Sequence, residues 1–101
     1  MIRFEILNKE KILQELPQLM ELIRGWEYSE WKEENFLYEL PRKWEFSFLV
    51  MDEGAINGFC IASNKIQSAY YIHLFFVRPN YRKKGIGEQM LHQAMNLGKQ
   101  Q

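Results

Sequence analysis

The stretch that decides the fold lies near the end of the chain, where residues 69–87 read AYYIHLFFVRPNYRKKGIG. Residues 69–77 are apolar on both faces, which is typical of a strand in the centre of a sheet that is covered on both sides. Residues 88–97 repeat apolar positions at helical spacing. The turn between this strand and this helix carries three adjacent cations and two glycines: Arg82, Lys83, Lys84, Gly85 and Gly87. A turn that is simply exposed to solvent needs neither feature.

A turn of this kind can bind a phosphate group. Backbone N–H groups that open a helix point outward together and carry the positive end of the helix dipole. Glycines at positions 85 and 87 remove the side chains that would hold an anion away from these N–H groups. A nucleoside-triphosphate loop is excluded because Gly87 is followed by Glu88, and a dinucleotide fingerprint is excluded because Met90 stands where it needs a third glycine. The simpler alternative is a basic surface turn whose glycines serve its geometry alone.

The composition is that of an ordinary globular domain. The chain has 101 residues, of which 47% are hydrophobic and 26% are charged, and it fits one domain. Because 13 basic residues balance 13 acidic ones, the overall charge favours neither nucleic acid nor an anionic membrane as a partner. No segment approaches the ~18 apolar residues of a membrane-spanning helix. The first residues lack an apolar signal segment and Cys60 is the only cysteine, so we expect a cytoplasmic protein without disulfides.

The first half of the chain predicts one strand and two helices. Apolar and polar residues alternate over residues 2–7, which predicts a half-buried strand. A helix should follow from a cap at Asn8 to Gly25, with a kink or a break at Pro17, near Leu16. A second helix should run from a cap at Ser29 to a stop at Pro41.

The second half predicts strands joined by short turns. Alternation over residues 46–51 predicts a strand, and two turn signals follow it, at residues 52–54 and at Asn57–Gly58. We place the turn at 52–54, because a turn at Asn57–Gly58 would leave a returning strand of barely five residues. The returning strand is then Ala55–Ser63, with Gly58 inside it, and residues 64–68 form the next turn. The expected order is strand, two helices, three strands and a helix.

Residues 74–87 closely resemble the acetyl-CoA-binding motif of the GNAT family of N-acetyltransferases. That motif reads Arg or Gln, two variable residues, Gly, one variable residue, and then Gly or Ala, and Arg82–Gly87 matches it. The preceding strand end and the following amphipathic helix also match, and Ile56–Phe59 looks like the family's usual third-strand start. The resemblance implies an acyl-CoA N-acyltransferase-like fold of the α+β (α/β) class. In that fold helices flank a mixed, mostly antiparallel sheet, here in the order β-α-α-β-β-β-α.

The resemblance also implies acetyl-CoA as the co-substrate. Its pantetheine arm would run along the backbone of Phe75, Phe76 and Val77, and its pyrophosphate would lie on the amides of Arg82, Lys83, Lys84, Gly85, Ile86 and Gly87. The implied reaction moves an acetyl group to the primary amine of a small-molecule or peptide acceptor. Two alternatives stay open: a catalytically incomplete CoA-binding module, and a regulatory or structural remnant of the fold.

Acetyl transfer requires that the acceptor amine lose a proton, which costs ~4–5 kcal/mol near pH 7. Two candidates for this catalysis, Tyr71 and His73, share one face of the apolar strand because side chains alternate with a period of two. His73 stands where family members often carry Glu; alternatively, it makes a hydrogen bond in a crowded interior. Three carboxylates fall in the region that lines the acceptor cleft in this family, where they either attract a cationic acceptor or form a solvated helix face: Glu30, Glu33 and Glu34.

Members of the family continue past the glycine-turn helix with further strands and a helix. We therefore expect residues 1–101 to form a single GNAT-like domain that lacks the family's C-terminal strands and helix. The tyrosine that often protonates the departing thiolate in the family has no match here. On this topology the outer edge of the strand at 69–77 is unpaired, so we expect the chain to self-associate as a homodimer.

Overall fold

The computed structural model describes residues 2–24, 31–66 and 69–99. The elements within these ranges are β1 (Arg3–Ile6), α1 (Lys9–Ile23), α2 (Glu33–Leu37), α3 (Lys43–Phe46), β2 (Phe48–Asp52), β3 (Ala55–Ile66), β4 (Ala69–Val77), the 3₁₀-helix η1 (Pro79–Lys84) and α4 (Ile86–Lys99). The expected order of strands and helices is present, and two short helices that the sequence did not predict, α3 and η1, are added to it.

The four strands form one antiparallel sheet in the order β1-β2-β3-β4. The turn between β2 and β3 lies at residues 52–54, as predicted. Gly58 lies inside β3, opposite Val50 on one side and Val77 on the other. The choice of this turn over the Asn57–Gly58 signal is therefore confirmed.

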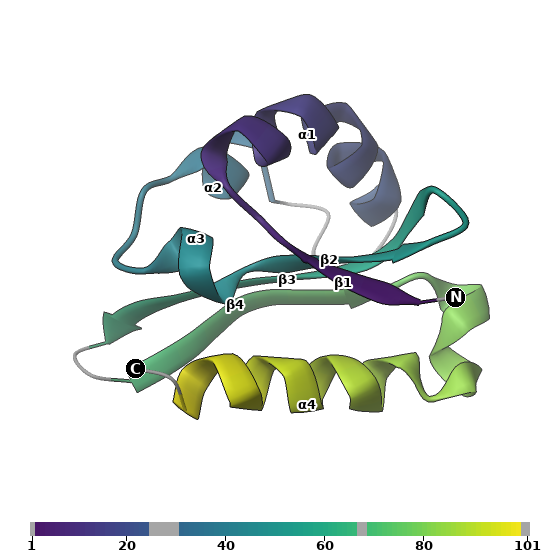
Figure 1. Cartoon of the computed structure of the whole chain (residues 1–101). Helices are drawn as coiled ribbons and strands as arrows, with labels where there is room; N and C mark the ends of the chain where they lie inside the picture. Colours follow the sequence, from purple (N-terminus) through teal and green to yellow (C-terminus); the bar gives the residue numbers. More distant parts are fainter. Residues whose placement is uncertain (1, 25–30, 67–68, 100–101) are drawn as a thin grey trace.

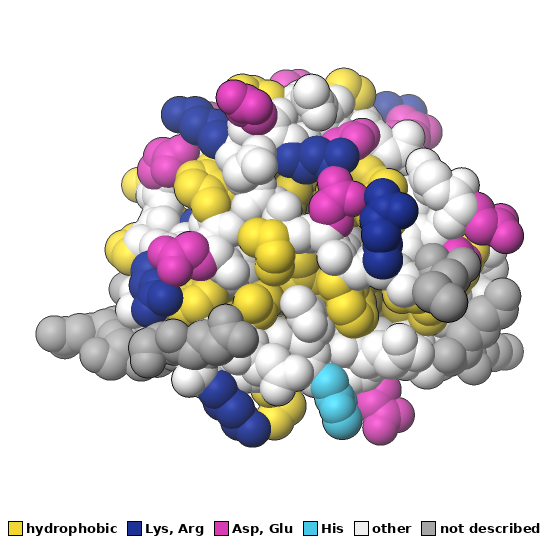
Figure 2. Space-filling view, in the orientation of Figure 1, with side chains coloured by type: hydrophobic (Ala, Val, Ile, Leu, Met, Phe, Trp, Pro, Cys, Tyr) yellow, Lys and Arg dark blue, Asp and Glu magenta, His cyan; other side chains and the backbone are white. Residues whose placement is uncertain are grey.

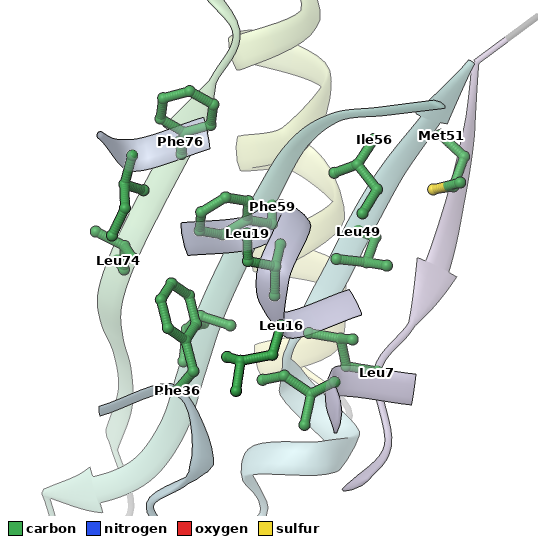
Figure 3. Packing of buried hydrophobic residues seen from close by; sticks show 13 residues of the cluster. Leu7, Leu16, Leu19, Phe36, Leu49, Met51, Ile56, Phe59, Leu74 and Phe76 are labelled. Atoms are coloured by element: carbon green, nitrogen blue, oxygen red, sulfur yellow. The ribbon is translucent and has the colours of Figure 1, made fainter. Parts of the chain in front are cut away.

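Helices cover both faces of the sheet: α1 and α2 lie on one face and α4 lies on the other (Figure 1). The core under α1 and α2 is drawn in Figure 3, where Leu16 and Leu19 of α1 and Phe36 of α2 face Leu49 and Phe59 of the sheet. The second core lies between the sheet and α4 and is built from Phe46, Phe48, Val50, Cys60, Ala62, Val77, Ile86, Met90 and Ala94. Because both faces are covered, consecutive residues of β2 and β3 are buried, which gives these strands their nearly continuous apolar sequences.

The cap predicted for the first helix is present. The Asn8 side chain accepts a hydrogen bond from the Lys11 backbone N–H at 2.7 Å, which satisfies one of the amides that helix geometry leaves unpaired. The predicted break at Pro17 is wrong, because α1 is one helix from Lys9 to Ile23. Pro17 lies on the exposed side of α1, so water can reach the Leu13 carbonyl that the proline leaves without its helical donor. The predicted end at Gly25 lies outside the described residues.

The region after residue 30 differs most from the prediction. The second helix is shorter than expected, since α2 covers only Glu33–Leu37, and its predicted cap Ser29 lies outside the described residues. Residues 43–46 form one turn of helix where a strand was predicted to begin, with Phe46 N–H donating to the Arg42 carbonyl at 3.1 Å. Phe46 is buried in the same core as Phe48. The alternation of apolar residues therefore extends back to Phe46 in the sequence, although the backbone at Phe46 is helical. The strand itself begins at Phe48.

The strand at 69–77 is present. The central place that its apolar faces predicted is wrong, whereas the unpaired outer edge expected from the topology is present among the described residues. β4 lies at one edge of the sheet formed by the described residues, and Tyr71 and Ile72 are 40% and 36% exposed. Its sequence is apolar because Leu74 and Phe76 enter one core and Val77 enters the other. β3 continues to Ile66, which shortens the predicted turn at 64–68.

Charged side chains of both signs are mixed over the upper part of the face drawn in Figure 2. The described residues form close ion pairs, such as Lys11 with Glu5 at 2.8 Å and Arg42 with Glu45 at 2.9 Å. The Lys11 ammonium and the Arg3 guanidinium hold the pKa of Glu5 below its ordinary value. The distribution agrees with the formal net charge of zero.

Candidate functional site: a helix-opening turn, a strand edge and a histidine

The turn between β4 and α4 is built around Gly85. The 3₁₀-helix η1 ends there in the left-handed conformation, with φ of 74°, which favours glycine strongly. No atom lies within 4 Å of the position that a Cβ would take at Gly85, so a side chain there would project into open space at the mouth of the turn. The predicted glycine therefore serves the backbone geometry and also keeps the turn accessible.

Gly85 is followed directly by a 14-residue helix, α4. The Gly85 carbonyl accepts the Gln89 N–H at 3.2 Å, which is the first bond of this helix. The amides of residues 86–88 precede the first hydrogen-bond donor of α4, so helix geometry gives them no partner within α4 and places the positive end of the dipole there. The Ile86 side chain is buried under the sheet, and only its backbone belongs to the turn. This end of α4 fits an anionic group such as a phosphate.

Three side chains fasten η1 to the sheet. Arg82 donates its Nε–H to the Val77 carbonyl at 2.8 Å, and Tyr81 donates its hydroxyl to Asp52 at 3.3 Å. Arg78 reaches the Ile56 carbonyl at 3.1 Å. Burial and the neighbouring Asp52 carboxylate raise the pKa of Tyr81. Arg82 therefore positions the turn against the strand in addition to carrying charge.

The backbones of Lys83 and Lys84 lie in η1, and the structure describes nothing of their side chains. That the pyrophosphate lies on the amides of these two residues remains a prediction.

The outer edge of β4 presents backbone groups next to this turn. Arg78 N–H donates to the Asn57 carbonyl at 2.8 Å, and bonded and non-bonded pairs alternate along an antiparallel ladder. Phe76, which lies opposite Phe59, is therefore in a bonded pair, whereas Phe75 and Val77 are in non-bonded pairs. The N–H and C=O groups of Phe75 and Val77 point away from β3, and the Arg82 bond to the Val77 carbonyl agrees with this direction. Of the three residues predicted to hold pantetheine, Phe75 and Val77 thus offer backbone groups at the edge, while those of Phe76 face β3.

A bulge in β4 determines where His73 lies. Ile61 pairs with Leu74 but Ala62 pairs with Ile72, so His73 is an extra residue in β4. Such a bulge brings two consecutive side chains to the same face of a sheet. Here it places His73 on the α2 face together with Leu74, although strict alternation would separate the two. The predicted pairing of Tyr71 with His73 is present, with ring centroids 4.7 Å apart.

His73 borders two hollows. One lies on the α2 face, has a volume of about 320 Å³, and is lined by Trp31, Asn35, Tyr38, Leu40, Lys43, Ile61 and His73. The other lies along β4, has a volume of about 160 Å³, and is lined by Ile72, His73, Leu74 and Phe75. Phe75 also carries the outward backbone groups of the strand edge. His73 therefore stands between that edge and a cavity large enough for a small amine.

Lys43 and Ser63 belong to this region, although the sequence singled out neither of them. The Lys43 ammonium donates to the carbonyls of Phe36 and Tyr38 at 2.5 and 2.6 Å, which fixes the chain after α2, and burial lowers the pKa of Lys43 to about 8. The Ser63 hydroxyl lies 2.7 Å from His73 Nε2. A charged residue just after Pro41 and a serine in a strand carry no sequence signal for such roles.

The remaining candidates lie away from this hollow. Glu33 and Glu34 are exposed on α2 and do not line it, which favours the solvated helix face, and Glu30 lies outside the described residues. Cys60 is buried in β3, where burial raises the pKa of its thiol to about 12.

A larger hollow of about 510 Å³ follows α4 and is lined by Phe4, Gly85, Glu88, Gln89, His92, Gln93 and Asn96. It shares Gly85 with the turn and does not include His73. His92 is exposed. Within residues 2–24, 31–66 and 69–99, no cluster of His, Cys, Asp and Glu could hold a metal ion, and no helix is long and apolar enough to cross a membrane.

Comparisons with known proteins identify a family and a similar fold. Residues 16–101 match the family model described as the acetyltransferase (GNAT) family. Among solved structures, the chain is similar to the ribosomal-protein-S18-alanine N-acetyltransferase from Escherichia coli, with a TM-score of 0.78 and 17% sequence identity. The similarity covers 99% of this chain and 61% of that chain, so this chain spans less than two thirds of its length. No curated protein sequence matches the chain.

Proposed function

Because the chain belongs to the acetyltransferase (GNAT) family, we propose that it binds acetyl-CoA and transfers the acetyl group to a primary amine. The observation that carries the proposal is the alignment of three features: the open turn at Gly85, the outward backbone groups of Phe75 and Val77, and His73 beside a cavity. The pyrophosphate, the pantetheine arm and the acceptor amine would thus bind next to one another, at the turn, at the strand edge and in the cavity.

The turn would hold the pyrophosphate. The amides at the start of α4 supply hydrogen-bond donors, and Arg82 adds a cation at the rim. The pantetheine arm would lie along β4, where its amide groups meet the N–H and C=O groups of Phe75 and the N–H of Val77 as another strand would; the Val77 carbonyl already accepts the Arg82 Nε–H. When bound, acetyl-CoA supplies a thioester whose carbonyl carbon accepts the amine.

His73 would take the proton that the acceptor amine must lose. Deprotonating an amine of pKa ~10.4 near pH 7 costs ~4–5 kcal/mol, and a base in the cavity lowers this barrier. An imidazole suits the task because its ordinary pKa of ~6.5 keeps it mostly neutral at pH 7. Tyr71, whose ring lies against His73, is the second candidate for this proton transfer.

Calorimetry with CoA and a matched pair of variants tests the binding step. Gly85→Glu should abolish CoA binding, because its side chain would occupy the mouth of the turn with a negative charge. Gly54→Glu is the control, because Gly54 has nearly the same φ of 77° and the same open surroundings in another turn. Equal CoA affinity in both folded variants would show that the turn at Gly85 does not bind CoA.

Release of CoA thiol in the presence of an amine panel tests the transfer step. The panel should include small primary amines and a peptide that begins with alanine, since the similar structure is that of a ribosomal-protein-S18-alanine N-acetyltransferase. CoA binding without thiol release for any amine would favour the second candidate, a CoA-binding module without activity. That candidate draws support from β4, which is an edge strand among the described residues.

We further propose that a second copy of the chain pairs along the part of β4 at Tyr71 and Ile72, beside the part at Phe75 and Val77 that would hold pantetheine. Tyr71 and Ile72 are partly exposed there, and an unpaired strand edge invites another strand. Light scattering after gel filtration should give twice the mass of 12.2 kDa, and a stable monomer at micromolar concentration would exclude this pairing. A cytoplasmic location is proposed because the single cysteine is a buried thiol, which suits a reducing compartment.

A further inference from the structure

Two aromatic side chains form part of the hollow on the α2 face. Trp31 precedes α2 and Tyr38 follows it, and both line this hollow of about 320 Å³. The apolar side chains of Leu40 and Ile61 line it as well. An apolar cavity of about 150 Å³ is sufficient to hold one molecule of benzene. The hollow therefore has room for an aromatic ring that carries a short chain.

The chain on either side of α2 holds the two aromatic residues in place. The Trp31 ring packs edge to face on Phe36, with ring centroids 5.0 Å apart. Phe36 is buried and packs in the same way on Phe59 of the sheet at 5.8 Å. The Tyr38 side chain is 66% exposed, but its backbone carbonyl accepts a hydrogen bond from Lys43 Nζ at 2.6 Å. A ligand would therefore meet a surface that is largely formed before it binds, which reduces the entropy lost on binding.

The charge of the lining distinguishes between two kinds of acceptor. Aromatic side chains bind the ring of a ligand and, through their faces, also an ammonium group. The Lys43 ammonium lies in the same lining, and with a pKa of about 8 it is mostly charged at pH 7. None of the lining residues that the structure describes is a carboxylate. A second positive charge on the acceptor would be repelled there, whereas an uncharged ring would not.

We propose that the hollow on the α2 face selects a primary amine whose body is an aromatic ring. This inference rests on the proposed function, in which the hollow takes the acceptor. The ring would pack against Trp31 and Tyr38, on the α2 side. The amine would lie on the β4 side, because the hollow reaches β4 at His73 and the smaller hollow beside it continues to Phe75, where the pantetheine arm would lie.

The selected amine would react as the proposed function requires. Its nitrogen forms a bond to the thioester carbonyl carbon, and the bond between that carbon and the sulfur breaks. CoA leaves as the thiolate, and one proton lost by the nitrogen converts it to the thiol. The products are an N-acetylated aromatic amine and free CoA.

Rates of CoA thiol release for three primary amines test the selection. Phenethylamine carries the aromatic ring, cyclohexylethylamine carries a saturated ring on the same chain, and cadaverine carries a second positive charge. The kcat/KM for phenethylamine should exceed that for cyclohexylethylamine by roughly 2–10-fold, the size expected for one aromatic pair. It should exceed that for cadaverine by roughly 10-fold or more. A kcat/KM for either control amine that equals or exceeds the value for phenethylamine overturns the selection and leaves acetyl transfer in place.

Replacing one ring shows whether the hollow is responsible. Tyr38→Ala removes an exposed side chain and keeps the backbone carbonyl that Lys43 holds, so the variant should fold. The KM for phenethylamine should rise by roughly 2–10-fold, while the dissociation constant of CoA stays unchanged. Leu13→Ala is the control, because Leu13 is 52% exposed and is not among the residues that line the hollow. The same KM in both variants overturns the proposal.

Fluorine NMR separates this inference from the proposed function, because it needs no turnover. The ¹⁹F signal of para-fluorophenethylamine is followed as the chain is added, with and without CoA. Saturable binding that Tyr38→Ala weakens and Leu13→Ala does not supports an aromatic amine site. If no amine then releases thiol, acetyl transfer alone is refuted. A ¹⁹F signal that the folded chain leaves unchanged refutes the selection, and thiol release from other amines would then retain the proposed function.

Discussion

Replacing Gly58 with alanine tests the packing that holds β3, β4 and α4 together. A Cβ at Gly58 would lie 2.8 Å from the Phe76 carbonyl oxygen and 3.3 Å from Met90 Sδ. The Met90 thioether can turn aside, but the Phe76 carbonyl belongs to the backbone of β4 and is held in the ladder. The strands must therefore separate or the new methyl group must remain in a close contact.

These distances set the expected loss in the free energy of unfolding of Gly58→Ala. Overpacking a core by one carbon costs about 1–3 kcal/mol, and the lower entropy of unfolded alanine returns about 0.4–1 kcal/mol. The free energy of unfolding should therefore fall by about 1–2 kcal/mol, which lowers the melting temperature by about 5–15 °C in a domain of this size.

Urea unfolding followed by tryptophan fluorescence measures this change. The midpoint should fall while the m-value stays constant, since the variant alters stability and not the surface exposed on unfolding. Gly87→Ala is the matched control, because the nearest atom to its Cβ would be Val77 Cγ2 at 4.0 Å, an ordinary contact. A wild-type midpoint for Gly58→Ala would refute the argument from close approach.

Three further predictions follow from single contacts. Between pH 8 and 10.5 the free energy of unfolding should rise with pH. Burial lowers the pKa of Lys43 to about 8 from 10.5, so in this range the unfolded chain binds more protons than the folded one. Urea titrations at several pH values measure this rise, and the same rise in Lys43→Met would contradict the prediction. Asn8→Ala should lower the free energy of unfolding by about 1 kcal/mol through loss of the Lys11 amide bond, whereas Asn8→Ser should lose less, and calorimetric melting decides between them. Arg82→Lys should weaken CoA binding by roughly 10-fold or more, because lysine cannot reproduce the hydrogen bond from Arg82 Nε to the Val77 carbonyl. An unchanged dissociation constant by calorimetry would show that Arg82 contributes to CoA binding only through its charge.

Local signals in the sequence were sufficient for much of the fold. Asn8 caps α1 because its side chain needs only the amide three residues later, and the turn at 52–54 follows from its short-range chemistry. The strand start at Phe46 was wrong because a buried aromatic ring satisfies a strand pattern and a helical turn equally well. Pro17 did not break α1 because its exposed side leaves the freed carbonyl to water, and exposure is decided by tertiary packing.

The candidate site was predictable only where a short motif defines it. The glycine turn could be identified from Arg82–Gly87 because its backbone geometry requires glycine at Gly85. The surroundings of His73 could not be predicted, because they depend on the register between β3 and β4 and on one extra residue in β4. Nothing in the sequence marks that residue, so Ser63 and the hollow on the α2 face became visible only in three dimensions.

The buried thiol in β3 has a practical consequence for measuring the reaction. Reagents that report free thiols react with the thiolate, and at pH 8 a thiol of pKa about 12 is ionised to roughly one part in 10⁴. Folded chain should therefore give almost no colour of its own, and the signal in a turnover assay would come from released CoA. When the chain unfolds, Cys60 becomes exposed and its pKa returns toward ~8.5, so one equivalent of protein thiol should then react. A single reagent can thus report turnover on the folded chain and, in the absence of substrate, the loss of the fold.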